Sequence, residues 1–348
     1  MDKRDLLDFD MEALRGLMAE LGEPAFRAKQ LYQMLARGTP FTGMLQLPAK
    51  LRERLDETCV ANGVTIERAF PSRNGDAEKY LYRLRDGHLI EGVRMRYKYG
   101  DTLCVSTQVG CRMGCLFCAS SLDGLARNLT CGEILGQIVA QSDSSGGFAR
   151  AAVHNVVLMG SGEPFDNYDN VLRFLRTVRD AEGLNIGARR ISLSTCGLPG
   201  AIERFSREGL PVTLSVSLHA PNDNIRGTIM PVAAALPIRE LLRECGIYFE
   251  SSGRRIIFEY ALIKDINDAP EHARELASLL RGMPCHVNVI PLNGVPERGL
   301  TATGGAGIRL FLEELTRAGV SATRRRTLGD EVAGACGQLR RSYSSADA

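Results

Sequence analysis

What the sequence lacks excludes several classes of protein. No uninterrupted apolar run approaches the ~18 residues of a membrane-spanning helix, and there is no internal repeat or long low-complexity tract. No G-x-G-x-x-G follows a predicted strand, so we do not expect a dinucleotide-binding Rossmann site. The N-terminal stretch MDKRDLLDFDMEALRGLM carries five acids, unlike a secretory signal or a transit peptide. We therefore expect a cytoplasmic protein with no membrane contact.

The composition is that of an ordinary globular protein with an unusual local density of cysteine. With 348 residues, 44% hydrophobic and 24% charged, the chain is long enough for one large domain plus a smaller one. Ten cysteines are too few for a disulfide scaffold, yet four fall between positions 104 and 118, which favours metal or redox chemistry. The net charge of +2 neither demands nor excludes a nucleic acid partner.

Residues 1–90 are predicted to form an accessory unit that is mainly helical. Apolar residues recur at helical spacing in three segments: 11–21, 25–38 and 47–59. Residues rich in β-forming side chains follow at 79–97, with a turn at Asp86-Gly87, and lead into the next domain. We assign residues 91–342 to a second domain, and residues 343–348 to a frayed tail.

From residue 101 onward, predicted strands alternate with predicted helices. The strands are 102–109, 155–160, 190–196, 212–220, 255–263 and 285–292, and they look apolar on both faces, as in a parallel sheet covered by helices. About six βα units favour either a doubly wound sheet or a complete or partial (β/α) barrel. The unusual residues follow the strand ends, where a barrel has its active face. The fold class is therefore α/β.

Three cysteines lie close together in the segment GCRMGCLFCAS, with the spacing C-x3-C-x2-C: Cys111, Cys115 and Cys118. A structural zinc site has four protein ligands, and no fourth cysteine or histidine stands at a matching spacing. Thiolates also bind iron–sulfur clusters, which usually take four cysteines. A [4Fe–4S] cluster held by three would leave one iron open to a small molecule. The alternatives are a zinc site with a remote ligand, or chance cysteines in a core.

This cysteine spacing, with Phe117 just before the last cysteine, resembles that of the radical S-adenosylmethionine (SAM) superfamily. The resemblance implies a [4Fe–4S] cluster whose open iron binds SAM, and a partial (β/α) barrel fold. An electron from the reduced cluster then cleaves SAM to a 5′-deoxyadenosyl radical. GSGEP at 160–164 is similar to a stretch that lies against the SAM amino group, which implicates Gly162 and Glu163. In isolation, this stretch is equally consistent with a glycine-rich turn.

Further motifs narrow the resemblance to the RlmN family of adenine-C2 RNA methyltransferases. They cover roughly residues 20–340 and occur in the family's order: FRAKQLYQ, TLCVSTQVGC, ARNLT, LSTCG, SLHAPND, NVIPLN and GDEVAGACGQL. The sequence departs from the family at Ser161, where methionine is usual, and at Ser120-Ser121-Leu122 in the loop after Cys118. Neither departure removes a ligand or a reacting group.

The resemblance gives roles to residues that would otherwise be ordinary core or surface positions. It makes Cys336 the methyl-carrying cysteine, Cys104 the resolving thiol and Glu91 the proton acceptor. By themselves, these residues would be an incidental cysteine, a strand-core cysteine and a strand-face carboxylate. The resemblance also implies a set of SAM-binding residues. They are Gly162, Glu163, Ser194, Ser217, Leu218, His219 and Asn293.

The implied chemistry uses two SAM molecules per turnover, because the C2 carbon of adenine is not nucleophilic. One SAM methylates Cys336, and the radical from the second removes a hydrogen atom from the new S-methyl group. The resulting methylene radical adds to C2 and leaves a covalent protein–RNA adduct. Glu91 then accepts the C2 proton, and Cys104 displaces the sulfur of Cys336 to form a disulfide bond, which fits a reducing cytoplasm.

The resemblance also implies the partners. The substrates are 23S rRNA and tRNA, the electron donor is a reductase or flavodoxin-type protein, and the enzyme is expected to be a monomer. The adenine must leave its stacked context to reach a barrel interior. Arg324, Arg325 and Arg326 are candidate phosphate contacts, although a solvated basic face is the plainer interpretation of such a run. The N-terminal unit is expected to grip the RNA.

Two rival functions remain at this stage. A Cfr-like methyltransferase acting on C8 of adenine shares the cysteines and the mechanism; Pro164 in GEP favours the C2 group over it. The other rival is a non-catalytic iron–sulfur or zinc RNA-binding protein. It would explain the cysteines and arginines, but not Glu91, Cys104 and Cys336, and it would not cleave SAM.

Overall fold

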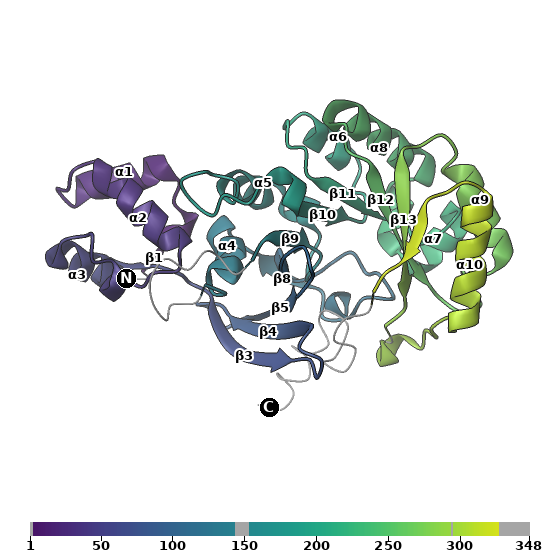
Figure 1. The fold of residues 1–348 in the computed structure, drawn as a ribbon, viewed down its shortest axis with the longest axis horizontal. Coiled ribbons are helices and arrows are strands. Elements are labelled where there is room, and N and C mark those ends of the chain that lie inside the picture. Colours follow the sequence, from purple (N-terminus) through teal and green to yellow (C-terminus); the bar gives the residue numbers. More distant parts are fainter. Residues whose placement is uncertain (1–2, 143–152, 294, 327–348) are drawn as a thin grey trace.

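The computed structural model describes residues 3–142, 153–293 and 295–326. Its N-terminal part is a small helical unit with its own core, seen at one end of the molecule in Figure 1. One leucine from each long helix, Leu14, Leu31 and Leu51, is fully buried there. The predicted helices are thus confirmed. The elements of this unit are β1 (Arg4–Asp5), η1 (Leu6–Asp8), α1 (Met11–Glu20), α2 (Phe26–Ala36), η2 (Phe41–Gly43), α3 (Ala49–Thr58) and β2 (Cys59–Val60).

A ten-stranded sheet forms the centre of the molecule, in the order β14-β13-β12-β11-β10-β9-β6-β5-β4-β3. Its antiparallel part is β3 (Thr65–Pro71), β4 (Ala77–Arg83) and β5 (Leu89–Met95). Its parallel part is β6 (Thr102–Cys104), β9 (Asn155–Leu158), β10 (Ile191–Thr195), β11 (Thr213–Ser217), β12 (Ile256–Leu262), β13 (Cys285–Pro291) and β14 (Ala322–Arg324). Val93 of β5 stands opposite Cys104 of β6. The strands that we grouped with the accessory unit are therefore hydrogen-bonded into this sheet.

The strand order identifies a partial barrel. From β6 to β14 each parallel strand lies beside its neighbour in the chain, so every crossover steps in the same direction. A doubly wound sheet would reverse its order at a switch point, and this sheet has no such reversal. Right-handed crossovers that all step one way place their helices on one face of the sheet. Because β14 and β3 remain separate edges, the barrel is open, and the predicted partial (β/α) barrel is confirmed.

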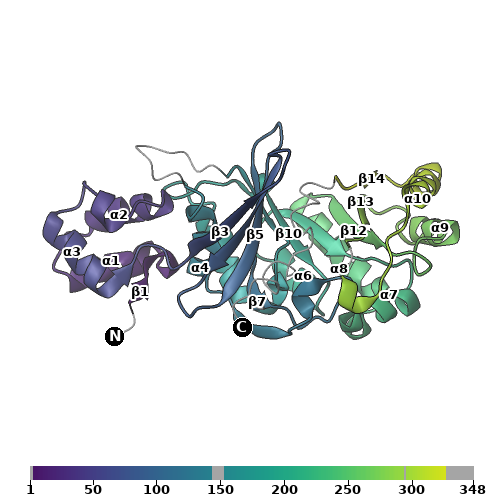
Figure 2. The same ribbon diagram turned by 90° about the horizontal axis from the view of Figure 1, so that it is seen from below.

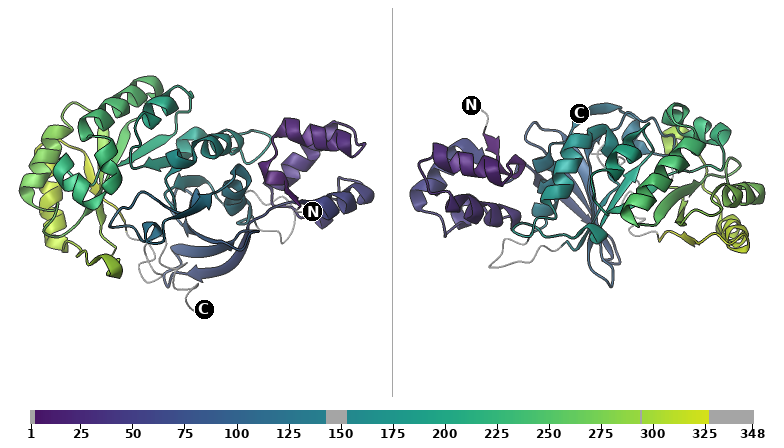
Figure 3. Two further views of the ribbon diagram at one scale, coloured as in Figure 1. Left: turned by 180° about the vertical axis from the view of Figure 1, so that it is seen from behind. Right: turned by 90° about the horizontal axis from the view of Figure 1, so that it is seen from above.

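Helices cover the convex face, as Figures 1 and 3 show. They are α4 (Cys131–Val139), α5 (Tyr168–Thr177), α6 (Ala201–Ser206), α8 (Ile238–Ser252), α9 (Pro270–Leu279) and α10 (Gly305–Arg317). Shorter elements at the connections are β7 (Gln108–Gly110), β8 (Leu125–Asn128), α7 (Asp223–Ile229), η3 (Ala119–Ser121), η4 (Pro164–Asn167), η5 (Ala188–Arg190), η6 (Pro231–Ala235) and η7 (Pro296–Arg298). Among the described residues, no helix is long and apolar enough to cross a membrane.

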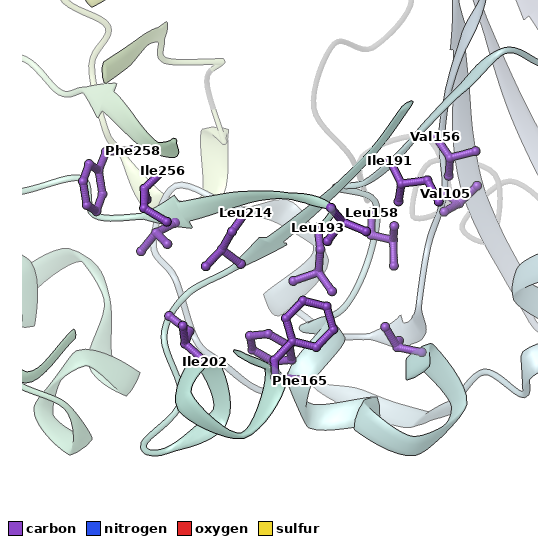
Figure 4. Packing of buried hydrophobic residues seen from close by; sticks show 14 of the residues in the cluster. Val105, Val156, Leu158, Phe165, Ile191, Leu193, Ile202, Leu214, Ile256 and Phe258 are labelled. Carbon is purple, nitrogen blue, oxygen red and sulfur yellow. The ribbon is translucent and has the colours of Figure 1, made fainter. Parts of the chain in front are cut away.

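The two faces of the parallel strands differ, contrary to our expectation that both would be apolar. Towards the helices, Leu158, Leu193 and Leu214 pack in the main core with Phe165 from the loop after β9 (Figure 4). The opposite face carries small polar and charged side chains. They are Ser192, Ser194, Thr213, Ser215, Ser217, Glu259 and Asn288. The prediction was wrong because the concave face of an open barrel lines cavities and is not covered by helices.

The N-terminal unit is tied to the barrel by polar contacts. The Asp8 carboxylate accepts a hydrogen bond of 2.6 Å from the backbone N–H of Gly132, at the start of α4. The Tyr32 hydroxyl donates to Asp180 at 3.1 Å, and Arg173 donates to the Asp8 carbonyl at 2.7 Å. Figure 2 shows this unit at one end of the molecule and α9 and α10 at the other.

Candidate active site

A cavity of about 260 Å³, lined by both apolar and polar side chains, lies at the carboxyl ends of the parallel strands. Of the ten residues predicted to bind the cluster or SAM, all but Leu218 line it. They are Cys111, Cys115, Cys118, Gly162, Glu163, Ser194, Ser217, His219 and Asn293. Leu218 is fully buried in the main core, so the structure does not bring its side chain to the cavity. Its backbone N–H donates to the Glu259 carbonyl at 3.1 Å.

The loop after β7 carries the three cysteines and is held by its own hydrogen bonds. The Ser121 hydroxyl donates to the carbonyls of Cys115 and Cys118, at 2.9 and 2.8 Å. Burial raises the pKa of the Cys111 thiol to about 12 and also raises the pKa of Cys115. A bound metal centre reverses such an effect, because it stabilises thiolates directly. The loop is thus suited to thiols that are charged only when they hold a metal.

The geometry favours a cluster over a single zinc ion. Within the described ranges, no three His, Cys, Asp or Glu side chains converge closely enough to hold one ion. Zinc needs such convergence, whereas a [4Fe–4S] cluster binds each thiolate through a different iron atom. Cys111 and Cys115 border an apolar cluster with Met113, Ile229 and Met230, which limits solvent access. The three cysteines therefore fit the larger group.

The GSGEP loop after β9 packs directly on the residues that follow β6. A Cβ atom on Gly160 would lie 2.7 Å from the Val105 carbonyl oxygen, and Gly162 has a φ of +111°. Both positions therefore require glycine. Glu163 accepts backbone N–H bonds from Phe165 and Cys196, at 3.0 and 2.8 Å, and burial raises its pKa. Its carboxylate thus joins the loops after β9 and β10, and an ammonium group in the cavity would meet a carboxylate already fixed in place.

The two departures from the family pattern contact each other. The hydroxyls of Ser120 and Ser161 are hydrogen-bonded at 3.0 Å, and both residues are almost fully buried. Ser120 belongs to η3 after the last cysteine, and Ser161 belongs to the GSGEP loop. The pair therefore links the cysteine loop to the GSGEP loop, and neither departure leaves an unpaired polar group at this point.

His219 is a buried, neutral histidine in a left-handed backbone conformation, with a φ of +55°. Its Nδ1 accepts a 2.9 Å hydrogen bond from the Ala261 N–H, so the ring proton lies on Nε2. Burial, with a smaller effect of Arg226, lowers its pKa to about 3. The ring of Phe117 packs against it with centroids 4.4 Å apart. His219 can therefore donate a hydrogen bond in the cavity without adding a charge.

Two buried charged residues of the site were not predicted. Glu259 on β12 lines the cavity, accepts from Asn288 at 3.1 Å, and has its pKa raised by burial. Arg226 is fully buried and donates to the carbonyls of Cys196, Ser217 and Leu236, at 2.7, 3.3 and 3.2 Å. The sequence signal for Glu259 is a single charge inside the apolar run RIIFEYALI. Arg226 has no such signal, because its partners are backbone atoms.

Glu91 and Cys104 lie on neighbouring strands of the sheet and on the same face. Cys104 stands opposite Val93, two residues from Glu91, and both residues are buried. The Glu91 carboxylate forms an ion pair of 3.0 Å with Lys79 of β4, whose side chain is also buried. Neither Glu91 nor Cys104 lines the first cavity. Cys336 lies outside the described residues.

A second and larger cavity of about 730 Å³ opens beside the first. Arg324, Arg325 and Arg326, our candidate phosphate contacts, line it. Met159, Glu259 and Arg325 line both cavities, so the two share a wall. Arg325 approaches the Glu259 carboxylate at 3.8 Å. Cys104 stands opposite Val157 of the neighbouring strand β9. Val157 is one of the residues that line the second cavity.

Comparison with known proteins agrees with this geometry. Residues 105–277 match the sequence profile of the radical SAM superfamily. A radical SAM methyltransferase from Sphaerobacter thermophilus has a similar crystal structure, with a TM-score of 0.91 and 41% identity over 96% of this chain and 98% of that one. Together with three cysteines at the rim of an open barrel, these likenesses define a radical SAM protein.

The N-terminal unit specifies the family within that class. Residues 4–61 match the ribosomal RNA large subunit methyltransferase N-terminal domain. Two curated relatives are each named probable dual-specificity RNA methyltransferase RlmN. One, from Alkaliphilus metalliredigens, is 47% identical over 99% of this chain and 97% of its own length. The other, from Clostridium tetani, is 44% identical over 97% of this chain and 96% of its own length. The chain belongs to the RlmN family.

Proposed function

We propose that this protein is a SAM-dependent radical methyltransferase that methylates C2 of adenosine in 23S rRNA and tRNA. The observation that carries the proposal is the cavity in which the three cysteines meet nearly all of the predicted SAM-binding residues. When bound, the [4Fe–4S] cluster and SAM supply the 5′-deoxyadenosyl radical and the methyl group. The protein supplies the binding, the orientation and the proton transfer.

The residues around the first cavity would hold the cofactors. Cys111, Cys115 and Cys118 would ligate the cluster through their thiolates. Glu163 is fixed by two backbone N–H groups, which supports a role in fixing the SAM amino group. His219 is held neutral, so it would orient SAM by a hydrogen bond without repelling the positive sulfonium centre.

Product release would use residues of β5 and β6. Cys336 carries the methyl group and becomes covalently linked to the RNA. Glu91 would accept the C2 proton, and the adduct would give up its unpaired electron to the oxidised cluster. The Cys104 thiolate would then attack the Cys336 sulfur, so that the sulfur–methylene bond breaks as the disulfide forms and the released carbon takes up a proton to become the C2 methyl group. The ion pair with Lys79 keeps the Glu91 carboxylate oriented on the sheet face. This cycle needs reduction of the disulfide, so we place the enzyme in the cytoplasm.

The remaining assignments concern the partners. We assign contacts with RNA phosphates to Arg324, Arg325 and Arg326, and binding of the RNA fold to the N-terminal helical unit. A flavodoxin-type protein or a reductase would supply the electrons. We expect a monomer, because a single chain carries both cavities and the residues predicted for each step.

The test is an anaerobic assay with reconstituted enzyme, reductant, SAM and unmodified RNA, in which digested nucleosides are analysed by mass spectrometry. We expect 2-methyladenosine. Formation of 8-methyladenosine would replace our proposal with the C8 alternative, and 5′-deoxyadenosine without any methyladenosine would show that the RNA substrate is wrong. Cys336→Ala should abolish methylation, whereas Cys285→Ala, at a half-buried position that lines neither cavity, should retain it.

A further inference from the structure

Two tyrosines form an aromatic pair at the edge of the second cavity. Tyr97 and Tyr99 lie in the connection between β5 and β6, and their rings are stacked with centroids 4.9 Å apart and an angle of 7° between the planes. Tyr99 is 73% exposed, which makes it one of the few large exposed hydrophobic side chains of the described structure. Such exposure loses the benefit of burying the ring, so the position suits a partner that covers it.

The same cavity is strongly basic. Its lining contains five arginines and one carboxylate, that of Glu259. The arginines are Arg189, Arg190, Arg324, Arg325 and Arg326. Arg325 is near Glu259, at 3.8 Å. For Arg189, Arg190, Arg324 and Arg326, the described part of the chain provides no ion-pair partner, although it contains many surface ion pairs elsewhere. These guanidinium groups are thus available for an anionic partner.

A stacked pair of rings, with Tyr99 exposed and Tyr97 half-buried, lies beside arginines that have no ion-pair partner among the described residues, and this matches the chemistry of single-stranded nucleic acid. Every base has a flat π-face that stacks on an aromatic side chain, and each nucleotide adds a phosphate that an arginine can bind. An acidic protein would satisfy the arginines but would leave the open face of Tyr99 without a flat partner. The position also fits, because Met159, Glu259 and Arg325 form a wall that this cavity shares with the SAM cavity.

We propose that Tyr97 and Tyr99 form a stacking platform for an unpaired base next to the target adenosine, and that Arg189 and Arg190 bind the adjoining phosphates. This inference rests on the proposed function, since it takes RNA as the substrate. The platform would continue the base stack that the target adenine leaves. It would thereby hold the neighbouring nucleotide at the cavity mouth while the adenine enters.

The experiment measures binding of a stem–loop RNA with one loop adenosine, in which 2-aminopurine replaces the base on either side in turn. Affinity is measured by fluorescence anisotropy, and stacking by quenching of the 2-aminopurine emission, with the cluster-loaded enzyme. We expect Tyr99→Ala to weaken binding by about 10- to 100-fold and to remove the quenching of one probe. Tyr99→Phe retains the ring and should retain both signals. Leu310→Ala removes another exposed hydrophobic side chain, on α10, and serves as the control for surface changes.

The arginines are tested by salt dependence. Removing one arginine–phosphate pair from a single-stranded site lowers the slope of log affinity against log salt by about 0.7, so Arg189→Gln combined with Arg190→Gln should lower it by about 1.4. Wild-type affinity in Tyr99→Ala would overturn the proposal, as would equal weakening in Tyr99→Phe or unquenched probes on the wild type. Because these measurements need no turnover, they are independent of the methylation assay. If the wild type quenches the 2-aminopurine probe but forms no methyladenosine, the proposed function is refuted and the stacking role of Tyr97 and Tyr99 is not.

Discussion

Replacing His219 by asparagine tests whether the histidine that lines the first cavity is held neutral. Asparagine tolerates the left-handed backbone at this position, and its side-chain oxygen can accept the Ala261 N–H as Nδ1 does. The substitution therefore removes the titration and retains the backbone geometry. It also removes the ring contact with Phe117, which lowers stability equally at all pH values.

The size of the expected stability change follows from the pKa of His219 in the folded and unfolded states. The pKa of His219 falls from the ordinary 6.5 to about 3 in the folded protein, so its contribution to stability is present above pH 6.5 and is lost as the pH falls towards 3. At pH 5.5 the unfolded chain binds a proton that the folded protein does not. When the pH falls from 7.5 to 5.5, this proton binding lowers the free energy of unfolding of the wild type by about 1.4 kcal/mol. His219→Asn lacks the titrating group and does not show this loss.

The assay is urea unfolding of the cluster-loaded protein at the two pH values. The wild type and His219→Asn both change in stability with pH because other groups titrate. The informative quantity is therefore the difference between the two proteins in how far the free energy of unfolding changes from pH 7.5 to pH 5.5. His154→Asn, at an exposed position, is the matched control and should follow the wild type. If His219→Asn and the wild type lose the same free energy of unfolding between pH 7.5 and pH 5.5, then His219 is not held neutral and the reasoning is wrong.

Three further predictions concern the loops and the reaction. In a double-mutant cycle measured by urea unfolding, Ser120→Ala and Ser161→Ala should each lower the free energy of unfolding by about 1 to 3 kcal/mol. The double variant should lose clearly less than the sum of the two, and additive losses would show that the hydroxyls do not interact. Arg226→Met leaves three buried carbonyls without a donor, so it should lower the free energy of unfolding by about 3 kcal/mol or more, and a loss below about 1 kcal/mol would contradict its role. Cys104→Ala should trap the RNA on Cys336, seen as a shifted band on a denaturing gel, and release of free methylated RNA would exclude Cys104 as the resolving thiol.

Much of the fold was predictable because its signals are local or follow from chain order. The helices of the N-terminal unit follow from apolar spacing, and the cysteine loop follows from three residues within one short segment. The partial barrel needed more, since strand direction and order emerge only when strands pair. The polar concave face was missed because a strand sequence such as VTLSVS does not state whether its serines face solvent, a helix or a cavity.

The missed parts of the site depend on contacts between residues far apart in the chain. Ser120 meets Ser161 only because the loops after β7 and β9 end at the same rim. Lys79 reaches Glu91 because β4 and β5 pair in a particular register, and a shift by one residue would point either side chain to the other face. Neither register nor loop contact can be read from one segment alone. The resemblance supplied Glu91, but not its ion-pair partner Lys79.

The continuous hydrogen-bonded sheet sets a limit on how this enzyme can move. Cys104 lies on β6 and Ser194 on β10, with only β9 between them, so their strands are about 10 Å apart at the usual spacing of neighbouring strands. A hydrogen-bonded ladder does not stretch or fold about a hinge without losing several bonds together. The separation between the strand of Cys104 and the strand of Ser194 is therefore fixed by the scaffold. On the roles proposed for Ser194 and Cys104, the enzyme has to serve both residues without changing the separation of their strands, so any adjustment must come from the loops or from the RNA.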